Sequence, residues 1–463
     1  MGERVLVLSD RHPPRHAGGA ELSLALSLAA LRGIAPDTQI AVAALDAGTE
    51  PASAPRPDAC GHLPFAGSYP DLGWVPDYYR LPGMSTARWL LRRSRQLYRV
   101  HARITPDRAL ARVTVDCAAH ALWNEGGRYH LVADLIHHSR ALPALAGLLA
   151  RVRPTLVHAD NFLAIHHLAM LRRLGLALPP CLGFVRDFRF VTPPRPVPRI
   201  ALHRQASRNG ALRPLRRTLL HLADRQDRAT ARAALQSMDG LAAASRFACR
   251  QTTALTGRRI HLVPNPALHQ RTAGSPRDPE PLIAVCSAII APRKGQDLVL
   301  RAAERAFPEH PRARLVFTGE SRSEGRSIVE AIPRSPIRDR IRLTGLIGHA
   351  ATVELMGRAR VVVSPGRLPE YFGRVVVEAA QHQTPCIAAA DGAHPELITH
   401  DRNGWLFPPG DVAALAEILR RILAHPDLAT AAGEHAAEEI GQRFPPERSA
   451  TALLDAWQTT CQT

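Results

Sequence analysis

The sequence predicts a two-domain α/β protein in which each domain is built on a doubly wound parallel sheet. The chain has 463 residues, which is too long for one ordinary domain and suits two. Short apolar segments alternate with helical segments of about ten residues, the pattern typical of parallel sheets. Hydrophobic residues make up 46% and charged residues 22% of the chain, close to the globular average, which excludes a disordered or collagen-like chain.

The first domain is expected over residues 1–272. An apolar strand at 5–8 precedes the glycine loop Gly18-Gly19, a helix at 21–31 and a second strand at 39–45. Further strands are expected at 155–158, 181–185 and 240–243. Residues 50–85 and 193–198 are rich in proline or glycine and predict loops, whereas residues 87–112 predict a basic helix with interspersed aromatic residues.

The second domain is expected over residues 281–440, where the alternation is most regular. The predicted strands are 282–286, 314–318, 340–343, 360–364 and 385–389. The predicted helices are 296–306, 324–332, 350–358 and 374–383, and a last helix follows at 446–459.

The charge balance favours acidic partners. The formal net charge is +18, yet only one of the 59 basic residues is a lysine, Lys294. Arginine has replaced lysine elsewhere, so the surviving ammonium indicates a place where a planar guanidinium does not fit.

Cysteine usage and hydropathy exclude several other classes. The 7 cysteines are scattered, with no C-x-x-C pair, which argues against a disulfide scaffold and a zinc site. No apolar run reaches the ~20 residues of a membrane-spanning helix, and the N-terminus predicts a strand rather than a signal peptide. We therefore expect a cytoplasmic protein.

The strongest site signal is the segment at 364–380, which leaves a predicted strand and enters a helix. Glu370 lies in its loop, Gly373 precedes the helix, and Glu378 lies within the helix. Parallel sheets bind ligands at the carboxyl ends of their strands, and free helix N–H groups can hold a phosphate. The alternative is a pair of solvated glutamates near a helix start.

Two further loops follow strands in the same way. Arg293, Lys294 and Gly295 lie between a strand and a helix, where two cations could neutralise a diphosphate. Gly18-Gly19 occupies the matching place in the first domain. An ordinary surface turn and a packing turn are the respective alternatives.

Together these motifs resemble those of the retaining glycosyltransferases of family 4, which have the GT-B fold of two Rossmann-like domains facing a central cleft. Glu370 to Glu378 resembles their E-x7-E motif, 292–295 their lysine–glycine loop, and 13–21 their N-terminal glycine loop. The segments 262–266 and 403–409 are also similar to family motifs.

The resemblance implies roles for these residues. Glu370 would contact the donor sugar, Glu378 the ribose and Lys294 the diphosphate; the other donor-binding candidates are Arg293, Gly295, Phe372, Gly373 and Arg374. It also implies that segment 445–463 packs back on the first domain, and that no metal or cofactor is required.

Two departures from the family pattern stand out. Family members usually carry an arginine five residues before the lysine, and this sequence has Ile289 there. They also often carry a histidine directly before an aspartate, and this sequence has Arg186 before Asp187. A guanidinium is not a general base near neutral pH, although it can bind a phosphate or a sugar hydroxyl. The catalytic candidates are thus Glu370, Lys294 and Arg186, and His158 and Asp187 are candidate acceptor or sugar contacts; for His158 a structural role is the alternative.

The predicted function is transfer of a sugar from a nucleotide-diphospho-sugar to a glycan, lipid-linked or small-molecule acceptor, with retention. The alternatives are an epimerase or a sugar phosphorylase on the same fold, a non-catalytic partner subunit, or a nucleic-acid-binding protein, which the even spread of arginine disfavours. The basic helix at 87–112 predicts peripheral contact with an anionic membrane, with a solvated helix as the alternative.

Overall fold

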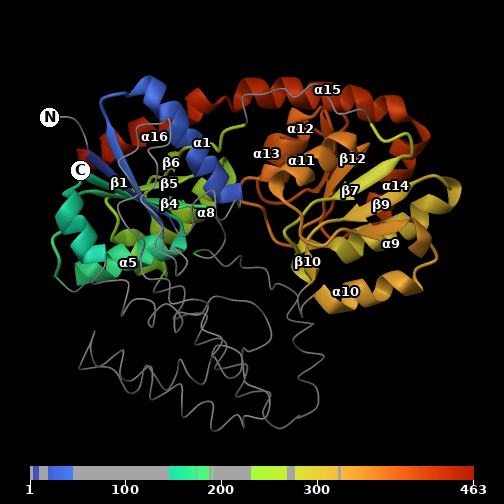
Figure 1. Ribbon diagram of the computed structural model, residues 1–463, viewed down its shortest axis with the longest axis horizontal. Helices are drawn as coiled ribbons and strands as arrows, with labels where there is room; N and C mark the ends of the chain where they lie inside the picture. Colours follow the sequence, from blue (N-terminus) through green and yellow to red (C-terminus); the bar gives the residue numbers. More distant parts are fainter. Residues whose placement is uncertain are drawn as a thin grey trace, which may run out of the picture.

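The computed structural model describes residues 4–9, 19–44, 145–173, 175–186, 190, 231–267, 277–321 and 325–462. These residues form two α/β domains, each with a six-stranded parallel sheet (Figure 1). The predicted fold class is therefore confirmed. The expected loop at 50–85, the basic helix at 87–112, Gly18 and Asp187 lie outside the described residues.

The N-terminal sheet has the strand order β2-β1-β3-β4-β5-β6. Its strands are β1 (Arg4–Ser9), β2 (Gln39–Ala44), β3 (Leu156–Asp160), β4 (Cys181–Val185), β5 (Gly240–Ala243) and β6 (His261–Leu262). Its helices include α1 (Gly19–Ile34), α5 (Phe162–Arg173) and α8 (Arg246–Thr256). The central strands β3, β4 and β5 are buried along their whole length, as expected of a parallel sheet covered on both faces.

The C-terminal sheet has the strand order β11-β9-β7-β12-β13-β14. Its strands are β7 (Leu282–Val285), β9 (Arg314–Phe317), β11 (Ile341–Leu343), β12 (Val361–Ser364), β13 (Cys386–Ala389) and β14 (Gly404–Phe407). A small parallel pair, β8 (Ile289–Ile290) with β10 (Glu320–Ser321), lies beside it. The strand order reverses between β7 and β12, so the switch point of this sheet lies at the carboxyl ends of these two strands.

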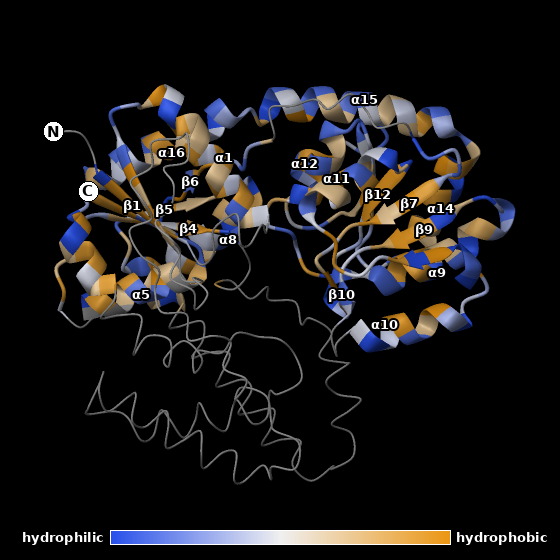
Figure 2. Ribbon diagram, viewed as in Figure 1, coloured by the Kyte–Doolittle hydropathy of each residue, from blue (hydrophilic) through white to orange (hydrophobic). Residues whose placement is uncertain are grey.

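Helices surround the C-terminal sheet, whose strands are strongly apolar (Figure 2). They are α9 (Gln296–Ala306), α10 (Arg326–Ala331), α11 (His349–Arg358), α12 (Arg374–Gln381), α13 (His394–Leu397), α14 (Val412–Ala424) and α15 (Pro426–Arg443). Short 3-10 turns lie at Pro292–Lys294, Phe307–Glu309, Ile332–Arg334 and Arg338–Arg340. No helix among the described residues combines the length and apolar character that crossing a bilayer requires.

The last helix, α16 (Pro446–Cys461), lies on the N-terminal domain. It follows α15, which runs along the C-terminal domain, and packs against α1 and strands β3 to β6 (Figure 1). Trp457 is fully buried there, and its Nε1 donates a hydrogen bond to His158 Nδ1 at 3.1 Å. The chain thus crosses between the domains twice.

Direct contacts also join the two domains. The amides of Arg246 and Phe247, at the start of α8, donate to the Glu396 carboxylate of the C-terminal domain. Ser245 Oγ donates to the carbonyl of Tyr371, whose ring packs edge-on against Phe247. Because Tyr371 follows Glu370 directly, the predicted site loop is itself part of the domain interface.

Candidate functional site

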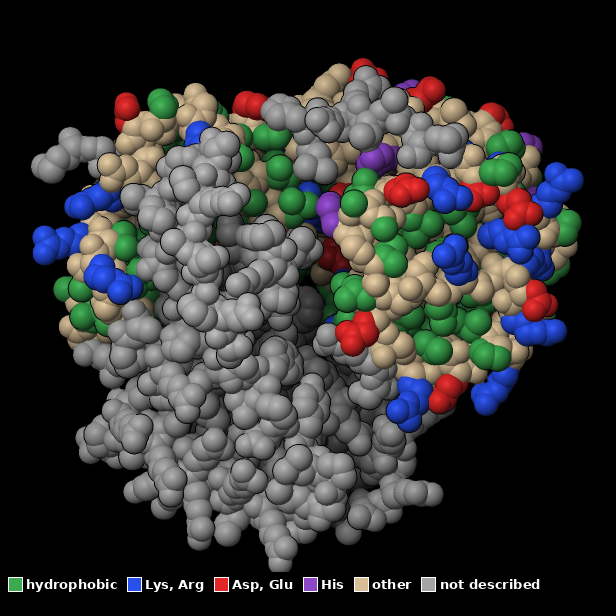
Figure 3. Space-filling view, in the orientation of Figure 1, with side chains coloured by type: hydrophobic (Ala, Val, Ile, Leu, Met, Phe, Trp, Pro, Cys, Tyr) green, Lys and Arg blue, Asp and Glu red, His purple; other side chains and the backbone are tan. Residues whose placement is uncertain are grey.

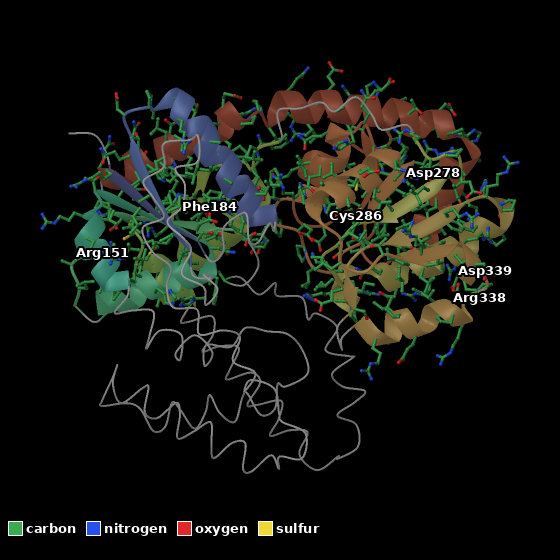
Figure 4. The ribbon with its side chains drawn as sticks, in the orientation of Figure 1. Arg151, Phe184, Asp278, Cys286, Arg338 and Asp339 are labelled. Atoms are coloured by element: carbon green, nitrogen blue, oxygen red, sulfur yellow. The ribbon has the colours of Figure 1, made fainter. Side chains whose placement is uncertain are left out.

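A pocket of about 430 Å³ lies at the switch point of the C-terminal sheet. Its walls come from residues that follow β7 and β12, from the start of α12, and from Gly19 and Leu22 of α1. Figure 4 labels Cys286, which directly follows β7 and lines this pocket. Both domains therefore contribute to one cavity, placed where open α/β sheets bind ligands.

Lys294 and Glu370 face each other on the pocket wall. Lys294 Nζ lies 3.0 Å from Glu370 Oε1, and each side chain is about a third exposed, at 38% and 35%. The nearby ammonium lowers the pKa of the Glu370 carboxyl, so this group is ionised at neutral pH. A charged donor and a charged acceptor are thus both open to a ligand.

The loop that carries Lys294 is fixed against the loop that carries Glu370. Gly295 has φ +77°, and a Cβ there would lie 2.2 Å from the carbonyl oxygen of Pro365. Arg367 N donates to the carbonyl of Arg293, and its guanidinium holds both oxygens of Asp297 at 2.6 Å. Glycine is required for this approach, and the bidentate pair sets the register of the two loops.

Helix α12 begins at the pocket without a side-chain cap. Gly373 has φ +88° and ψ +52°, the left-handed conformation that glycine adopts without strain. A Cβ at this position would lie 3.0–3.1 Å from Leu397 and His394. The first amides of α12 therefore remain available for an anionic ligand.

Glu378 lies one turn into α12 and is paired with Arg374. Arg374 Nε donates to Glu378 Oε1 at 2.8 Å, and the two side chains are only 10% and 9% exposed. Cys286 lies near them, and burial together with the Glu378 charge raises the pKa of its thiol to about 12. This thiol is therefore neutral and unreactive at physiological pH.

His394 is a buried residue that contacts the pocket residue Ser364. Its Nδ1 lies 2.9 Å from the carbonyl oxygen of Ala389 and donates to it, which leaves Nε2 to accept from Ser364 Oγ at 3.3 Å. Burial lowers the pKa of His394, although the Glu370 carboxylate opposes this effect. A neutral imidazole thus orients Ser364, which lines the pocket.

The N-terminal domain places a different set of charges at the ends of its strands. Arg186, after β4, donates from Nε to Asp160 Oδ1 at 2.8 Å and from Nη1 to Asn265. Its guanidinium covers the ring of Phe184 at 3.7 Å (Figure 4 labels Phe184). His158 is fully buried, with Nε2 3.6 Å from Asp160. Arg186 and His158 do not line the pocket described above.

The structure brings together much of the predicted site. Lys294, Glu370, Gly373, Arg374, Glu378 and Gly19 all line the pocket. Gly295 and Phe372 lie behind it instead: Gly295 packs under Pro365, and Phe372 is buried edge-on against Phe444. Arg293 does not line the pocket either, although its carbonyl joins the two loops.

Sequence reasoning missed His394 and His349. His394 follows β13 and supports Ser364, while His349 begins α11 and lines the pocket. The signal available for His394 was its place after the strand next to β12, where side chains reach the same edge of the sheet.

No metal centre is formed within the described ranges. There, no group of three or more histidine, cysteine, aspartate or glutamate side chains is arranged to hold an ion. The cationic groups on the pocket wall are Lys294 and Arg374.

The chain is similar to known glycosyltransferases, most clearly in its second half. Residues 271–439 match the family model of glycosyl transferases group 1. The D-inositol 3-phosphate glycosyltransferase of Streptomyces coelicolor is 29% identical over 215 residues, which are 43% of this chain and 46% of that protein. The glycogen synthase of Mycobacterium tuberculosis is 30% identical over 164 residues, 35% of this chain and 39% of that protein. The matched region is thus less than half of each relative's length.

Solved structures resemble the whole chain at low sequence identity. Sucrose-phosphate synthase from Thermosynechococcus elongatus has a TM-score of 0.66 at 18% identity and covers 99% of this chain and 98% of its own. Anabaena HepE in complex with UDP has a TM-score of 0.60 at 16% identity, with 99% and 100% covered. Residues 271–439 therefore match the glycosyl transferases group 1 model, and the chain as a whole has the two-domain GT-B fold of these solved structures.

Proposed function

We propose that the chain transfers a sugar from a nucleoside diphosphate sugar to an acceptor hydroxyl. The observation that carries this proposal is the Lys294–Glu370 pair at the switch-point pocket, with Nζ and Oε1 3.0 Å apart and both groups open to a ligand. An ammonium suits a diphosphate, and an ionised carboxylate suits the hydroxyls of a sugar. A ligand that carries a diphosphate next to a sugar therefore matches the Lys294–Glu370 pair.

Three pocket side chains and the start of α12 have roles in this reaction. The bond between the anomeric carbon and the diphosphate oxygen breaks, and its electrons leave with the diphosphate. The acceptor hydroxyl forms the new bond to the anomeric carbon, and its proton passes to the departing diphosphate. Lys294 and the first amides of α12 stabilise the charge of the leaving group, because their positions are fixed before it develops. Glu370 holds the donor sugar, and Glu378 holds the ribose.

Three finer features belong to the same proposal. The reaction proceeds with retention at the anomeric carbon, it requires no metal ion, and the donor is a nucleotide-diphospho-hexose. Family resemblance motivates all three, and the solved HepE complexes with UDP and with UDP-glucose support a nucleotide-sugar donor. The N-terminal domain binds the glycan, lipid-linked or small-molecule acceptor.

A nucleic-acid-binding function is not favoured. On the face that Figure 3 shows, the described part of the C-terminal domain carries lysine or arginine and aspartate or glutamate side chains intermingled. A nucleic-acid interface requires basic side chains gathered on one surface.

The test is binding followed by turnover. Titration calorimetry of the full chain against uridine, adenosine and guanosine diphosphates is expected to detect binding of at least one, which Lys294→Ala weakens. With the matching sugar nucleotide and an acceptor panel in EDTA, proton NMR should detect a glycoside with the donor's anomeric configuration. A chain that binds none of the three diphosphates, or that epimerises the donor, would refute the proposal.

A further inference from the structure

Arg374 connects the donor pocket to the N-terminal domain. Its Nε donates to Glu378 Oε1, and its Nη1 donates to Ser23 Oγ at 2.9 Å and to the carbonyl oxygen of Pro266 at 3.1 Å. Ser23 belongs to α1 of the N-terminal domain, and Pro266 follows β6 on the way to the second sheet. One buried guanidinium thus contacts a pocket carboxylate, the other domain and the segment between them.

Ser23 also links Arg374 to the pocket through Gly19. Ser23 is fully buried, and its hydroxyl donates to the carbonyl of Gly19 at 2.7 Å while it accepts from Arg374. A Cβ at Gly19 would lie 3.1 Å from Arg374 Cδ, so the first turn of α1 rests directly on this side chain. Gly19 lines the pocket, whereas Ser23 does not.

The segment after β6 is held by two arginines, one from each domain. Arg186 of the N-terminal domain donates to the side chain of Asn265, and Arg374 of the C-terminal domain donates to the carbonyl of Pro266. Asn265 and Pro266 are adjacent in the chain. A shift of one domain against the other therefore alters the surroundings of Arg374.

The observed contacts do not use the whole guanidinium. Nη2 of Arg374 is buried and has no hydrogen-bond partner among the described residues. A buried donor without an acceptor is costly, so Arg374 is stabilised by any arrangement that supplies one. The residue also lines the pocket, where a sugar nucleotide would bring acceptor oxygens.

We propose that Arg374 is a positioning residue that couples occupation of the donor site to the arrangement of the two domains. It holds Glu378 for the nucleotide only when Ser23 and Pro266 accept its hydrogen bonds. A nucleotide that binds Glu378 therefore favours the arrangement in which α1 closes the pocket. The coupling is reciprocal, so a change at Ser23, which does not line the pocket, weakens nucleotide binding. This inference rests on the proposed function.

The test compares two serines of α1. Ser23→Ala removes the one side-chain acceptor that the described part of the N-terminal domain offers to Arg374. Ser27→Ala is the matched control, because Ser27 is also buried and donates one turn back along α1, to the carbonyl of Ser23, but its other partner is Ser449 of α16 and not Arg374. Calorimetric titration of the full chain with uridine, adenosine and guanosine diphosphates should give about fivefold to tenfold weaker binding for Ser23→Ala and unchanged binding for Ser27→Ala.

A double-mutant cycle then isolates Arg374. Arg374→Leu should weaken binding by about tenfold to a hundredfold, and Ser23→Ala should have no further effect in that background. Arg374→Lys should restore part of the affinity. If Ser23→Ala weakens binding equally with and without Arg374, or acts no differently from Ser27→Ala, the inference is overturned while the proposed function stands. A wild-type chain that binds none of the diphosphates refutes the proposed function itself. Circular dichroism checks folding, and the serine pair decides the question if Arg374→Leu does not fold.

Discussion

Each domain places an ion pair at the carboxyl ends of two neighbouring strands, and the two pairs differ strongly in exposure. In the N-terminal domain, Arg186 and Asp160 follow β4 and end β3, and their side chains are only 3% and 2% exposed. In the C-terminal domain, Lys294 and Glu370 follow β7 and β12 and are about a third exposed. The first pair is closed by its neighbours, whereas the second faces a pocket.

The difference shows that position at a strand end does not by itself make a ligand site. Arg186 donates hydrogen bonds to Asp160 and Asn265, and the flat face of its guanidinium packs on Phe184. Lys294 contacts one carboxylate oxygen and keeps donors for a ligand. We therefore infer that the N-terminal pair supports the fold and the C-terminal pair supports binding. Four experiments can break or sharpen this contrast.

The largest expected effect is on stability, at the N-terminal pair. Asp160→Ala leaves Arg186 buried without its carboxylate and should reduce the free energy of unfolding by about 3–5 kcal/mol, measured by urea denaturation. Asp160→Leu combined with Arg186→Met should recover most of this loss, because no charge then remains buried. Asp278→Ala, which breaks a more exposed pair with Arg358, is the control and should cost less than about 1 kcal/mol. Equal effects at Asp160 and Asp278 would contradict the contrast.

The C-terminal pair should show the opposite behaviour. Lys294→Ala should lower kcat by about 10²–10³ because it removes a preorganised cation from the leaving group. Its effect on the free energy of unfolding should stay below about 1 kcal/mol, since the pair is exposed. Lys294→Arg should retain part of the activity. Arg305→Ala, an exposed cation on α9, is the control and should leave kcat unchanged. Wild-type turnover in Lys294→Ala would remove the lysine from the mechanism.

Most of the fold could be predicted because its signals are local. The continuous apolar runs at β7, β9, β12 and β13 and the helices between them lie within one or two residues of their expected bounds. The two-residue strands β6, β8 and β10 were missed, because their pairing depends on partners distant in the chain.

The site was harder to predict, because exposure and pairing depend on tertiary contacts. Lys294 and Glu370 are 76 residues apart in sequence, and their motifs predicted a shared ligand but not a direct ion pair. Arg186 was chosen because it stands where the family pattern has a histidine, yet Asn265, 79 residues away, completes its surroundings. Its catalytic role stays a prediction, as does that of Glu370.

The bidentate ion pair between Arg367 and Asp297, called the clamp below, should have a smaller effect. It tests how much activity depends on the positions of the pocket loops rather than on the charges that face the ligand. Asp297→Asn should weaken the bidentate contact that fixes the two pocket loops and lower kcat by about tenfold, since small misplacements of catalytic groups slow reactions. Glu304→Gln is the control, because Glu304 lies on the same helix and bonds Ser335 away from the pocket. Steady-state kinetics should show the loss only for Asp297→Asn. Equal kcat in both variants would show that the loops hold their register without the clamp.

The smallest expected effect concerns two buried histidines, one near each of the two ion pairs. Burial lowers the pKa of both His158 and His394, so the folded protein resists their protonation while the unfolded chain does not. Stability is therefore unaffected well above the usual histidine pKa and is lost as the pH falls from that value toward the lowered one. The loss is about 1.4 kcal/mol for each pH unit that separates the two pKa values. His394→Asn removes the contribution of His394, so its free energy of unfolding should fall less than that of the wild type between pH 7.5 and 5.5. His435→Asn, at an exposed position, is the control and should follow the wild type. Parallel pH profiles for all three proteins would mean that His394 is protonated as readily in the folded protein as in the unfolded chain, and would contradict its role as a neutral imidazole that orients Ser364.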